Sequence, residues 1–276
     1  MTTFQFIPVT AYPLLGPYIA KMYVFESSGR LPAEDKKLIV PNANFKLTFT
    51  WRNGIVARVG DSTFLQKENR LSLSGLIDSP VNLNAEEDAP TGTIVIELNP
   101  LGAYRFFPLA YVHVKNQIVE LTDLIGHNAV ELESRLGEAD TLNMKLGLLQ
   151  DFLIGQLGKS DIDPIYDFCI QRISDTKGLI TVSELEKKTG YSARWLNKKF
   201  TEHLGTGPKN LSEIVRFKEF YQAYSTGLHL RKFKGPIYDY YYDQSHFIRA
   251  FKRFTGFIPS DLQAGVNELA TRHYTS

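Results

Sequence analysis

The sequence predicts an α+β protein with an N-terminal β-barrel or two-sheet sandwich, a helical linker, and an all-α C-terminal part containing two helix-turn-helix units. Three observations support this fold class: short strands of alternating polarity, a leucine stripe at helical spacing, and a pattern that occurs twice near the end. A chain of 276 residues is long enough for two domains. We predict a β-rich domain over residues 1–120, a linker over 121–162 and a helical domain over 163–276.

The β-rich prediction depends mainly on one strictly alternating segment. One face of this segment carries the apolar side chains Phe45, Leu47, Phe49 and Trp51. Asn53 and Gly54 then predict a hairpin turn. Further predicted strands cover residues 55–59, 71–74 and 93–98. The aromatic face of the first strand is the predicted lining of a ligand pocket, and an ordinary filled core is the alternative that these residues leave open.

The predicted linker contains a long helix with leucines on one side. The stripe consists of Leu142, Leu146, Leu149, Leu153 and Leu157. It has two interpretations: the helix packs on its own domain, or it forms the contact of a homodimer. The segment from Gly158 to Asp163 is the predicted hinge, and Asp163 and Pro164 begin the next helix.

A repeat with a period of 51 residues dominates the C-terminal part. Five positions are identical in its two copies, without a gap: Tyr191 and Tyr242, Phe200 and Phe251, Gly205 and Gly256, Pro208 and Pro259, Leu211 and Leu262. A self-match at a fixed period indicates one supersecondary unit used twice.

The repeated unit has the start and stop signals of a helix. Ser192 and Asp243 are favourable N-cap residues, and each copy ends near a glycine that is followed by a proline. Thr181 and Glu184 form a capping box that opens an earlier helix, and Gly190 ends it. Helix, glycine turn and helix is the helix-turn-helix pattern, which we predict at about residues 181–204 and 236–255.

The charge of the chain is divided between its two parts. Residues 176–276 hold 16 Lys and Arg against 9 Asp and Glu, a net charge of +7, whereas residues 1–175 carry −6. A solvated positive face is one explanation of this excess. In combination with the repeat, the excess favours binding to DNA phosphates.

At this point the sequence resembles a known family. The segment from Tyr242 to Arg249, followed by Phe251 and Gly256, is similar to the signature of the AraC/XylS-type DNA-binding domain. A weaker resemblance of the N-terminal half to a subset of AraC-like regulators rests on Pro41, Asn42, Gly75 and the segment Asn99 to Gly102. The resemblance implies a cupin-like N-terminal domain that senses a signal or mediates association, DNA as partner, and two reading helices. It also implies a bacterial activator that contacts RNA polymerase.

The resemblance also assigns roles to individual residues. The predicted DNA-binding side chains are Ser192, Arg194, Asn197, Lys198, Lys199, Gln244, Ser245, His246 and Arg249. In the major groove, arginine or lysine reads guanine and asparagine reads adenine. For His246 a second interpretation stays open, a helix-start residue that bonds only to the backbone. Trp195, Leu196, Phe200, Phe247 and Phe251 are predicted core residues, and Tyr191 and Tyr242 are predicted packing residues.

The second unit departs from the family pattern. Gly235 and Pro236 stand where its supporting helix is expected, and Tyr240 stands where a turn glycine is expected. Proline inside a helix removes a hydrogen bond, so we expect that helix to be short or irregular.

The sequence offers little for catalysis. The single cysteine, Cys169, is expected to be a buried side chain in a reducing cytosol. The six histidines show no metal-binding spacing, and there is no phosphate loop or nucleophile elbow. We therefore expect no enzyme activity, no catalytic or metal-binding residues and no cofactor. No apolar run spans a membrane and no signal peptide is evident, so we expect a cytoplasmic protein.

The sequence thus predicts a sequence-specific transcription regulator that binds double-stranded DNA; the resemblance implies that it is an activator controlled by an unknown signal, with a small-molecule effector as a candidate. The main alternative is a ligand-sensing or partner-binding module whose second helix-turn-helix has lost DNA recognition. A weaker one is a β-barrel enzyme with an accessory DNA-binding domain.

Overall fold

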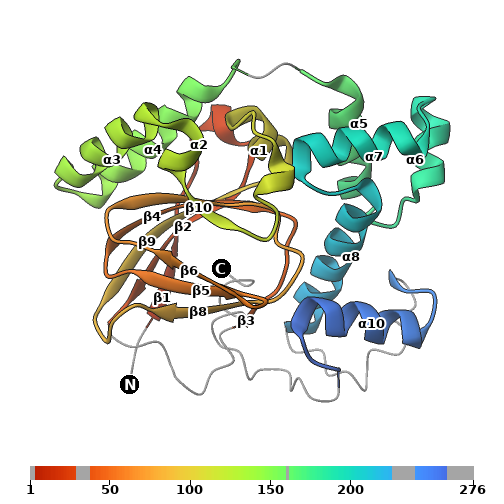
Figure 1. The fold of residues 1–276 in the computed structure, drawn as a ribbon, viewed down its shortest axis with the longest axis horizontal. Helices are drawn as coiled ribbons and strands as arrows, with labels where there is room; N and C mark the ends of the chain where they lie inside the picture. The colour runs from red at the N-terminus through yellow and green to blue at the C-terminus, as the bar shows by residue number, and fades with distance from the viewer. Residues whose placement is uncertain (1–3, 29–37, 160–161, 226–239, 260–276) are drawn as a thin grey trace.

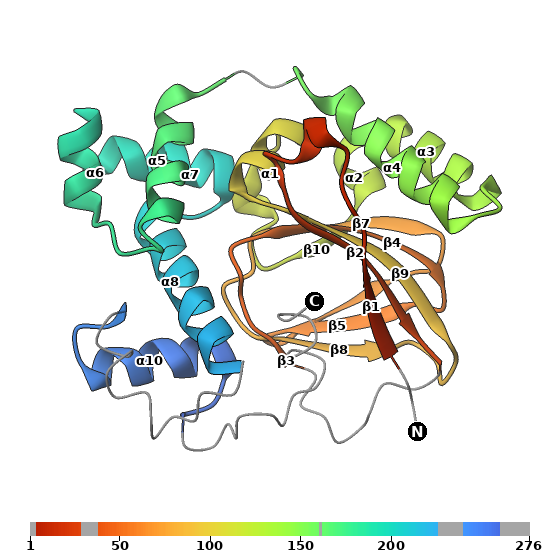
Figure 2. The same ribbon diagram turned by 180° about the vertical axis from the view of Figure 1, so that it is seen from behind.

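The N-terminal half of the protein is an antiparallel β sandwich and the C-terminal half is helical (Figure 1). The computed structural model describes residues 4–28, 38–159, 162–225 and 240–259. The helical unit lies beside the sandwich, and the same arrangement is seen from behind in Figure 2. This architecture confirms the predicted α+β fold class. The predicted domain boundaries stay a prediction.

Two antiparallel sheets make up the sandwich. The six-stranded sheet contains, in spatial order, β1 (Phe4–Pro8), β2 (Ile19–Ser27), β9 (Thr91–Leu98), β4 (Phe45–Arg52), β7 (Arg70–Ser74) and β10 (Ile118–Glu120). The four-stranded sheet contains β3 (Leu38–Ile39), β8 (Val81–Ala85), β5 (Ile55–Val59) and β6 (Ser62–Gln66).

The predicted hairpin after the first alternating strand is wrong. Strand β4 pairs with β7 and β9, whereas β5 pairs with β6 and β8, so the chain passes from one sheet to the other at Asn53. Asn53 does adopt the expected positive φ, 54°. Its side-chain amide, however, donates to the carbonyls of Glu87 and Ala89, each at 3.0 Å. Contacts with the β8–β9 loop therefore stabilise this turn. Pairing between its two flanking strands does not contribute, because β4 and β5 belong to different sheets.

Strand β4 has two different faces, as its alternation predicts. Phe45, Leu47 and Phe49 are at most 1% exposed and belong to the main hydrophobic core. Helices α2 (Leu121–Ile125), α3 (His127–Glu138) and α4 (Leu142–Gln156) cover this side of the six-stranded sheet (Figure 1). The other face of β4 points between the two sheets.

The leucine stripe lies on α4 and packs within this chain. Leu146, Leu149 and Leu153 are buried, and Leu142 and Leu157 are partly buried against the same core. Packing on its own domain is therefore the interpretation that the structure supports, because the stripe leaves no continuous leucine face for a second copy.

The helical half begins with α5 (Pro164–Asp175) and continues with α6 (Val182–Thr189), α7 (Ala193–Leu204), α8 (Pro208–Ser225) and α10 (Gln244–Thr255). The capping signals have the predicted roles. Thr181 and Glu184 form the reciprocal capping box of α6, and Asp163 caps α5 by accepting a hydrogen bond from the Tyr166 amide at 3.0 Å.

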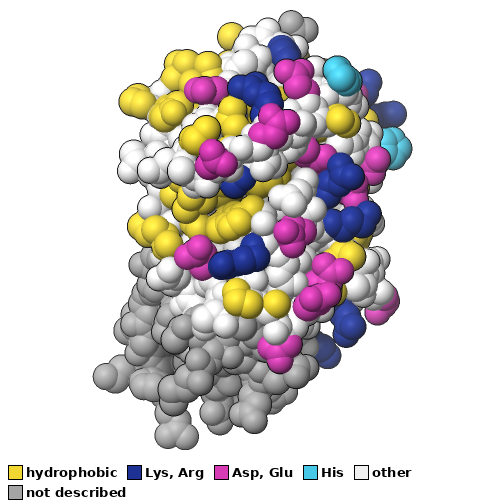
Figure 3. Space-filling view, turned by 90° about the vertical axis from the view of Figure 1, so that its left-hand side faces the viewer, with side chains coloured by type: hydrophobic (Ala, Val, Ile, Leu, Met, Phe, Trp, Pro, Cys, Tyr) yellow, Lys and Arg dark blue, Asp and Glu magenta, His cyan; other side chains and the backbone are white. Residues whose placement is uncertain are grey.

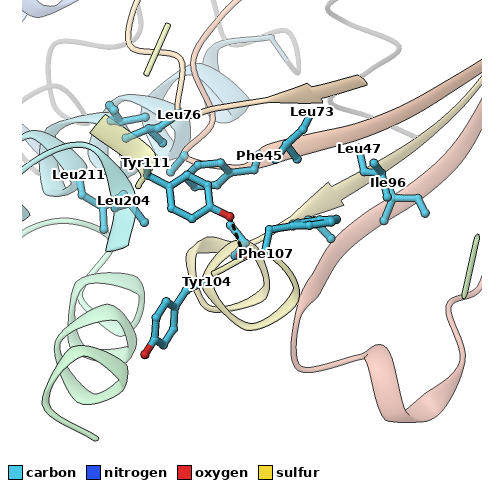
Figure 4. Close-up of a cluster of buried hydrophobic side chains, with 14 of the residues drawn as sticks. Phe45, Leu47, Leu73, Leu76, Ile96, Tyr104, Phe107, Tyr111, Leu204 and Leu211 are labelled. Atoms are coloured by element: carbon cyan, nitrogen blue, oxygen red, sulfur yellow. Dashed lines mark hydrogen bonds between the residues drawn. The ribbon is translucent and has the colours of Figure 1, made fainter. Parts of the chain in front are cut away.

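The hydrophobic core runs without a break from the sheet into the helical half. Tyr111 lies at the junction, in the short helix η2 (Tyr111–His113), with Phe45 on one side and Leu204 and Leu211 on the other (Figure 4). Its hydroxyl donates to the carbonyl of Ala103 in α1 (Pro100–Phe106) at 2.6 Å. A shared core of this kind couples the position of the helices to the β sandwich.

Candidate DNA-binding interface

The first helix-turn-helix unit consists of α6, a three-residue turn and α7. Gly190 ends α6 with φ of 74°, a left-handed conformation that glycine adopts without steric cost. The Ser192 hydroxyl then accepts a hydrogen bond from the Trp195 amide at 3.3 Å and starts α7. Leu196 and Phe200 are buried, which confirms their predicted place in the core.

Three of the predicted base-reading side chains lie on the solvent side of α7. Arg194, Asn197 and Lys198 are exposed. Among the described residues, the ion pair of Lys198 is a long one, 3.8 Å, with Glu202 of the same helix. Ser192 is also exposed, but its hydroxyl caps the helix. These positions face away from the core, where a ligand in contact with the helix would meet them.

Lys199 lies apart from this group. Its ammonium group is 3.0 Å from the carboxylate of Asp163 and lies over the ring of Trp195. The hydrogen bond to Asp163 raises the pKa of Lys199. Lys199 thus contacts the residue that caps α5, and its predicted role in DNA binding stays a prediction.

The carboxylate of Asp163 contacts three groups on two helices, α5 and α7. Besides the Tyr166 amide and Lys199, its carboxylate contacts Nε2 of His203 at 3.2 Å. Burial alone would raise the pKa of Asp163, but the hydrogen bonds from these three groups outweigh burial and lower it. The residue at the predicted hinge therefore fixes the start of α5 to α7.

The second reading helix, α10, has the same construction. Asp243 accepts a hydrogen bond from the His246 amide at 2.7 Å, and Gly256 ends the helix with φ of 78°. Gln244, Ser245 and Arg249 are exposed and His246 is half-buried. The sequence segment around Gly235 and Pro236 lies outside the described residues.

The repeat places exposed cations at equivalent positions. Lys198 on α7 and Arg249 on α10 are 51 residues apart, and both are exposed. Phe247 and Phe251 on the opposite side of α10 are buried, as predicted. Both helices thus bury one apolar side and expose one basic side.

Two aromatic predictions need correction. Trp195 is only partly buried, because it stacks on the exposed Tyr191 with 4.1 Å between ring centroids. Tyr242 is 92% exposed and does not pack. Its neighbour Tyr241 is buried in its place. The repeat aligns Tyr242 with Tyr191, which is also exposed, and aligns the buried Tyr241 with Gly190.

Asp78, in the loop between β7 and β8, joins the β sandwich to the helical unit. Its carboxylate accepts hydrogen bonds from Asn116 at 2.7 Å and from Asn210 of α8 at 3.1 Å. Lys115 at 2.8 Å and Arg253 of α10 at 3.3 Å complete the cluster. No sequence pattern marked this residue, since its partners are as many as 175 positions away along the chain.

This cluster predicts a pH dependence of stability. Burial alone would raise the pKa of Asp78, but hydrogen bonds from Lys115, Asn116 and Asn210 outweigh burial and lower it. A lowered folded-state pKa contributes stability above the unfolded value of about 3.9, and this contribution is lost as the pH falls below that value.

We therefore expect Asp78→Asn to reduce the free energy of unfolding by about 1–3 kcal/mol at neutral pH. We also expect the variant to show a flatter decline than the parent between about pH 5 and 3. Urea unfolding at several pH values measures both effects. Parallel curves for the two proteins would contradict the role of Asp78.

The turn after α7 predicts a second stability difference. Gly190 and Gly205 have φ of 74° and 75°, so alanine at either position is strained by roughly 1–2 kcal/mol. Only at Gly205 would the new Cβ also lie 2.5 Å from the carbonyl oxygen of Tyr111, whereas Gly190 has open space. Thermal unfolding should therefore show a larger loss for Gly205→Ala than for Gly190→Ala, and equal losses would refute this tight contact.

A cavity that opens to solvent lies between the two sheets. Its lining is mostly apolar, with Tyr23, Phe25 and Ile55 among its members, and Lys46 and Thr48 contribute polar groups. The predicted pocket residues of β4 lie elsewhere: Phe45, Leu47 and Phe49 fill the core under the helices, and Trp51 covers Gly92. The alternation of β4 was correctly predicted, but the opposite face lines the cavity.

Hydrophobic side chains also gather across the middle of one face of the molecule, with charged side chains of both signs around them (Figure 3).

Within the described residues, no helix is long and apolar enough to cross a membrane. No group of three or more potential metal ligands comes together in that same part of the chain. Cys169 is fully buried, as predicted, and burial raises the pKa of its thiol to about 11.

No family model matches the chain, and no curated protein matches it. Among solved structures, ToxT from Vibrio cholerae aligns at 13% identity over 94% of this chain and 97% of that chain, with a TM-score of 0.45. A structure of ToxT from the same organism bound to an unsaturated fatty acid aligns at 14% identity over 87% and 94% of the two chains, with a TM-score of 0.46. The AraC-like transcriptional activator CuxR aligns at 11% identity over 82% and 88%, with a TM-score of 0.30.

Proposed function

We propose that this chain is a sequence-specific DNA-binding transcription regulator of the AraC/XylS type. The observation that carries the proposal is the duplicated helix: α7 and α10 have the same capping pattern, bury one apolar side and expose basic and amide side chains. In this proposal Arg194, Lys198 and Arg249 read guanine or meet phosphate, and Asn197 and Gln244 read adenine.

The helix between the two units supports simultaneous binding. Helix α8 contains 18 residues and therefore spans about 27 Å. Successive major-groove segments on one face of DNA are about 34 Å apart. A rigid connection of this length suits two reading helices that enter neighbouring segments of the groove.

We further propose that an effector binds between the two sheets. The largely apolar lining of this cavity favours an apolar small molecule, and Lys46 adds one cationic group. The continuous core through Tyr111 provides a physical connection from the sandwich to the helices. Activation, contact with RNA polymerase, a homodimer and a cytoplasmic location complete the proposal, and they rest on the family resemblance alone.

The test is a selection of bound sequences from random duplex DNA by the purified full-length protein, at about 0.15 M salt, a concentration at which non-specific binding is partly suppressed. Enrichment of two half-elements about one helical turn apart would support a regulator with both units engaged. A single half-element would restrict the proposal to α7. No enrichment, with and without cell extract as a source of effector, would favour the alternative of a sensing or partner-binding module.

A further inference from the structure

A hollow of about 520 Å³ lies between α8 and α10, on the side of α10 that carries Arg249. Its charged and polar lining consists of Arg216 and Glu213 from α8, His246, Arg249 and Arg253 from α10, and Tyr241 just before α10. Among the described residues, the lining thus contains three guanidinium groups and one carboxylate. The excess of positive charge predicts an anionic occupant.

The three arginines differ in how much of their binding capacity is in use. Arg253 contacts the carboxylates of Glu213 at 2.9 Å and of Asp78 at 3.3 Å. Arg216 donates to the carbonyl of Gly178 at 2.6 Å and has no ion pair among the described residues. Arg249 has neither an ion pair nor a hydrogen bond with any described residue, and it is exposed. Arg249 is therefore free to bind a ligand, and Arg216 has unused donors.

Tyr241 supplies an independent indication of a ligand. Its side chain is only 4% exposed, yet its hydroxyl has no hydrogen-bond partner within the described part of the chain. Leaving a buried hydroxyl unpaired is costly, so such a group calls for a partner that completes the site. Burial raises the pKa of Tyr241 far above neutral pH, and the charges of Arg216 and Glu213 act on the same hydroxyl. The hydroxyl therefore stays protonated at neutral pH and is a potential hydrogen-bond donor in the lining of the hollow.

We propose that this hollow binds an oxyanion of the phosphate type, held by Arg249 and Arg216 and by a hydrogen bond from the Tyr241 hydroxyl. Guanidinium groups match the geometry of phosphate oxygens, and a buried neutral donor adds selectivity for an acceptor. The phosphate belongs either to a DNA backbone or to a free phosphorylated molecule. Binding of the anion itself does not depend on the proposed function.

The first experiment measures binding of inorganic phosphate to the full-length protein by calorimetry, with chloride at the same ionic strength as reference. We expect saturable binding of phosphate. Arg249→Ala should weaken it by about tenfold or more, because a charged hydrogen-bonding partner is lost. Tyr241→Phe keeps the ring and removes only the hydroxyl, and should weaken phosphate binding by about fivefold. Lys252→Ala removes an exposed charge from α10 outside the hollow and should change binding less than twofold.

Phosphate binding no stronger than chloride binding would overturn the proposal. An unchanged phosphate affinity in the Tyr241→Phe variant would overturn it as well. A loss with Lys252→Ala as large as with Arg249→Ala would also overturn it, because general charge and not the hollow would then be responsible. Thermal unfolding of each variant without phosphate verifies that Tyr241→Phe is folded.

The second experiment identifies the source of the anion by fluorescence anisotropy with duplex DNA of random sequence. A backbone phosphate predicts that inorganic phosphate competes with DNA and that Tyr241→Phe lowers affinity for every sequence by one factor. A free phosphorylated molecule predicts that phosphate and DNA bind without competition. Both results uphold the anion site. A protein without any DNA binding would remove the proposed function but leave the calorimetric result intact.

Discussion

Phe251→Ala is expected to reduce the free energy of unfolding by about 3–5 kcal/mol. Phe251 is fully buried, and its ring contacts those of Phe217, Phe220 and Phe247 at centroid distances of 5.9, 6.4 and 5.6 Å. Alanine would leave a cavity among aromatic rings that belong to different helices and cannot easily close around it. Since domains are typically stable by only 5–15 kcal/mol, a large share of the total would be lost.

Trp195→Ala is the matched comparison on the other reading helix. Trp195 is larger than Phe251, but it is partly buried and stacks mainly on an exposed tyrosine. Its removal should cost less than about 2 kcal/mol, because much of its surface already contacts water. Urea denaturation of both variants measures the two losses in free energy of unfolding. A loss for Trp195→Ala equal to that for Phe251→Ala would place Trp195 in the core, as its helical spacing alone suggests.

Local signals in the sequence predicted local structure well. The capping box of Thr181 and Glu184, the N-caps Ser192 and Asp243, and the glycine ends of α7 and α10 all have the predicted geometry. These features depend on residues within four positions of one another, so the sequence contains all that determines them.

Features that depend on distant partners were predicted less well. The alternation of β4 was clear, but nothing within the strand tells which face meets helices and which meets the second sheet. Lys46 and Thr48 line the cavity because β5 and β8 lie opposite them, in a sheet that β4 does not join. The hairpin prediction at Asn53 failed for the same reason.

In the candidate site, too, only the features that depend on nearby residues could be predicted from the sequence. Exposure of Arg194, Asn197 and Arg249 follows from helical periodicity, which is a local property. The hollow between α8 and α10 follows from the angle between two helices, and the unpaired hydroxyl of Tyr241 becomes visible only when that angle is known. No local pattern distinguishes Tyr241 from its neighbours Tyr240 and Tyr242.

Combined replacement of Arg194 and Arg249 by alanine is expected to produce the largest loss of sequence-specific DNA binding. One base-reading contact is typically worth about 1–3 kcal/mol. The two residues lie on different helices, α7 and α10, so their effects should add, to about 2–6 kcal/mol or roughly one to four powers of ten in Kd. The selected DNA sequence, titrated by fluorescence anisotropy at constant salt, measures the loss.

Arg58→Ala is the matched control, since Arg58 is an exposed arginine on β5 in the sandwich. Loss of one positive charge there should change Kd only slightly, because exposed charges farther apart than about 10 Å are largely screened. Each single variant then tests its own helix: if only Arg194→Ala weakens binding, α7 alone reads DNA, and if only Arg249→Ala does, α10 alone does. Unchanged affinity in the double variant would mean that the exposed basic faces of the two repeated helices are not the surfaces that bind DNA.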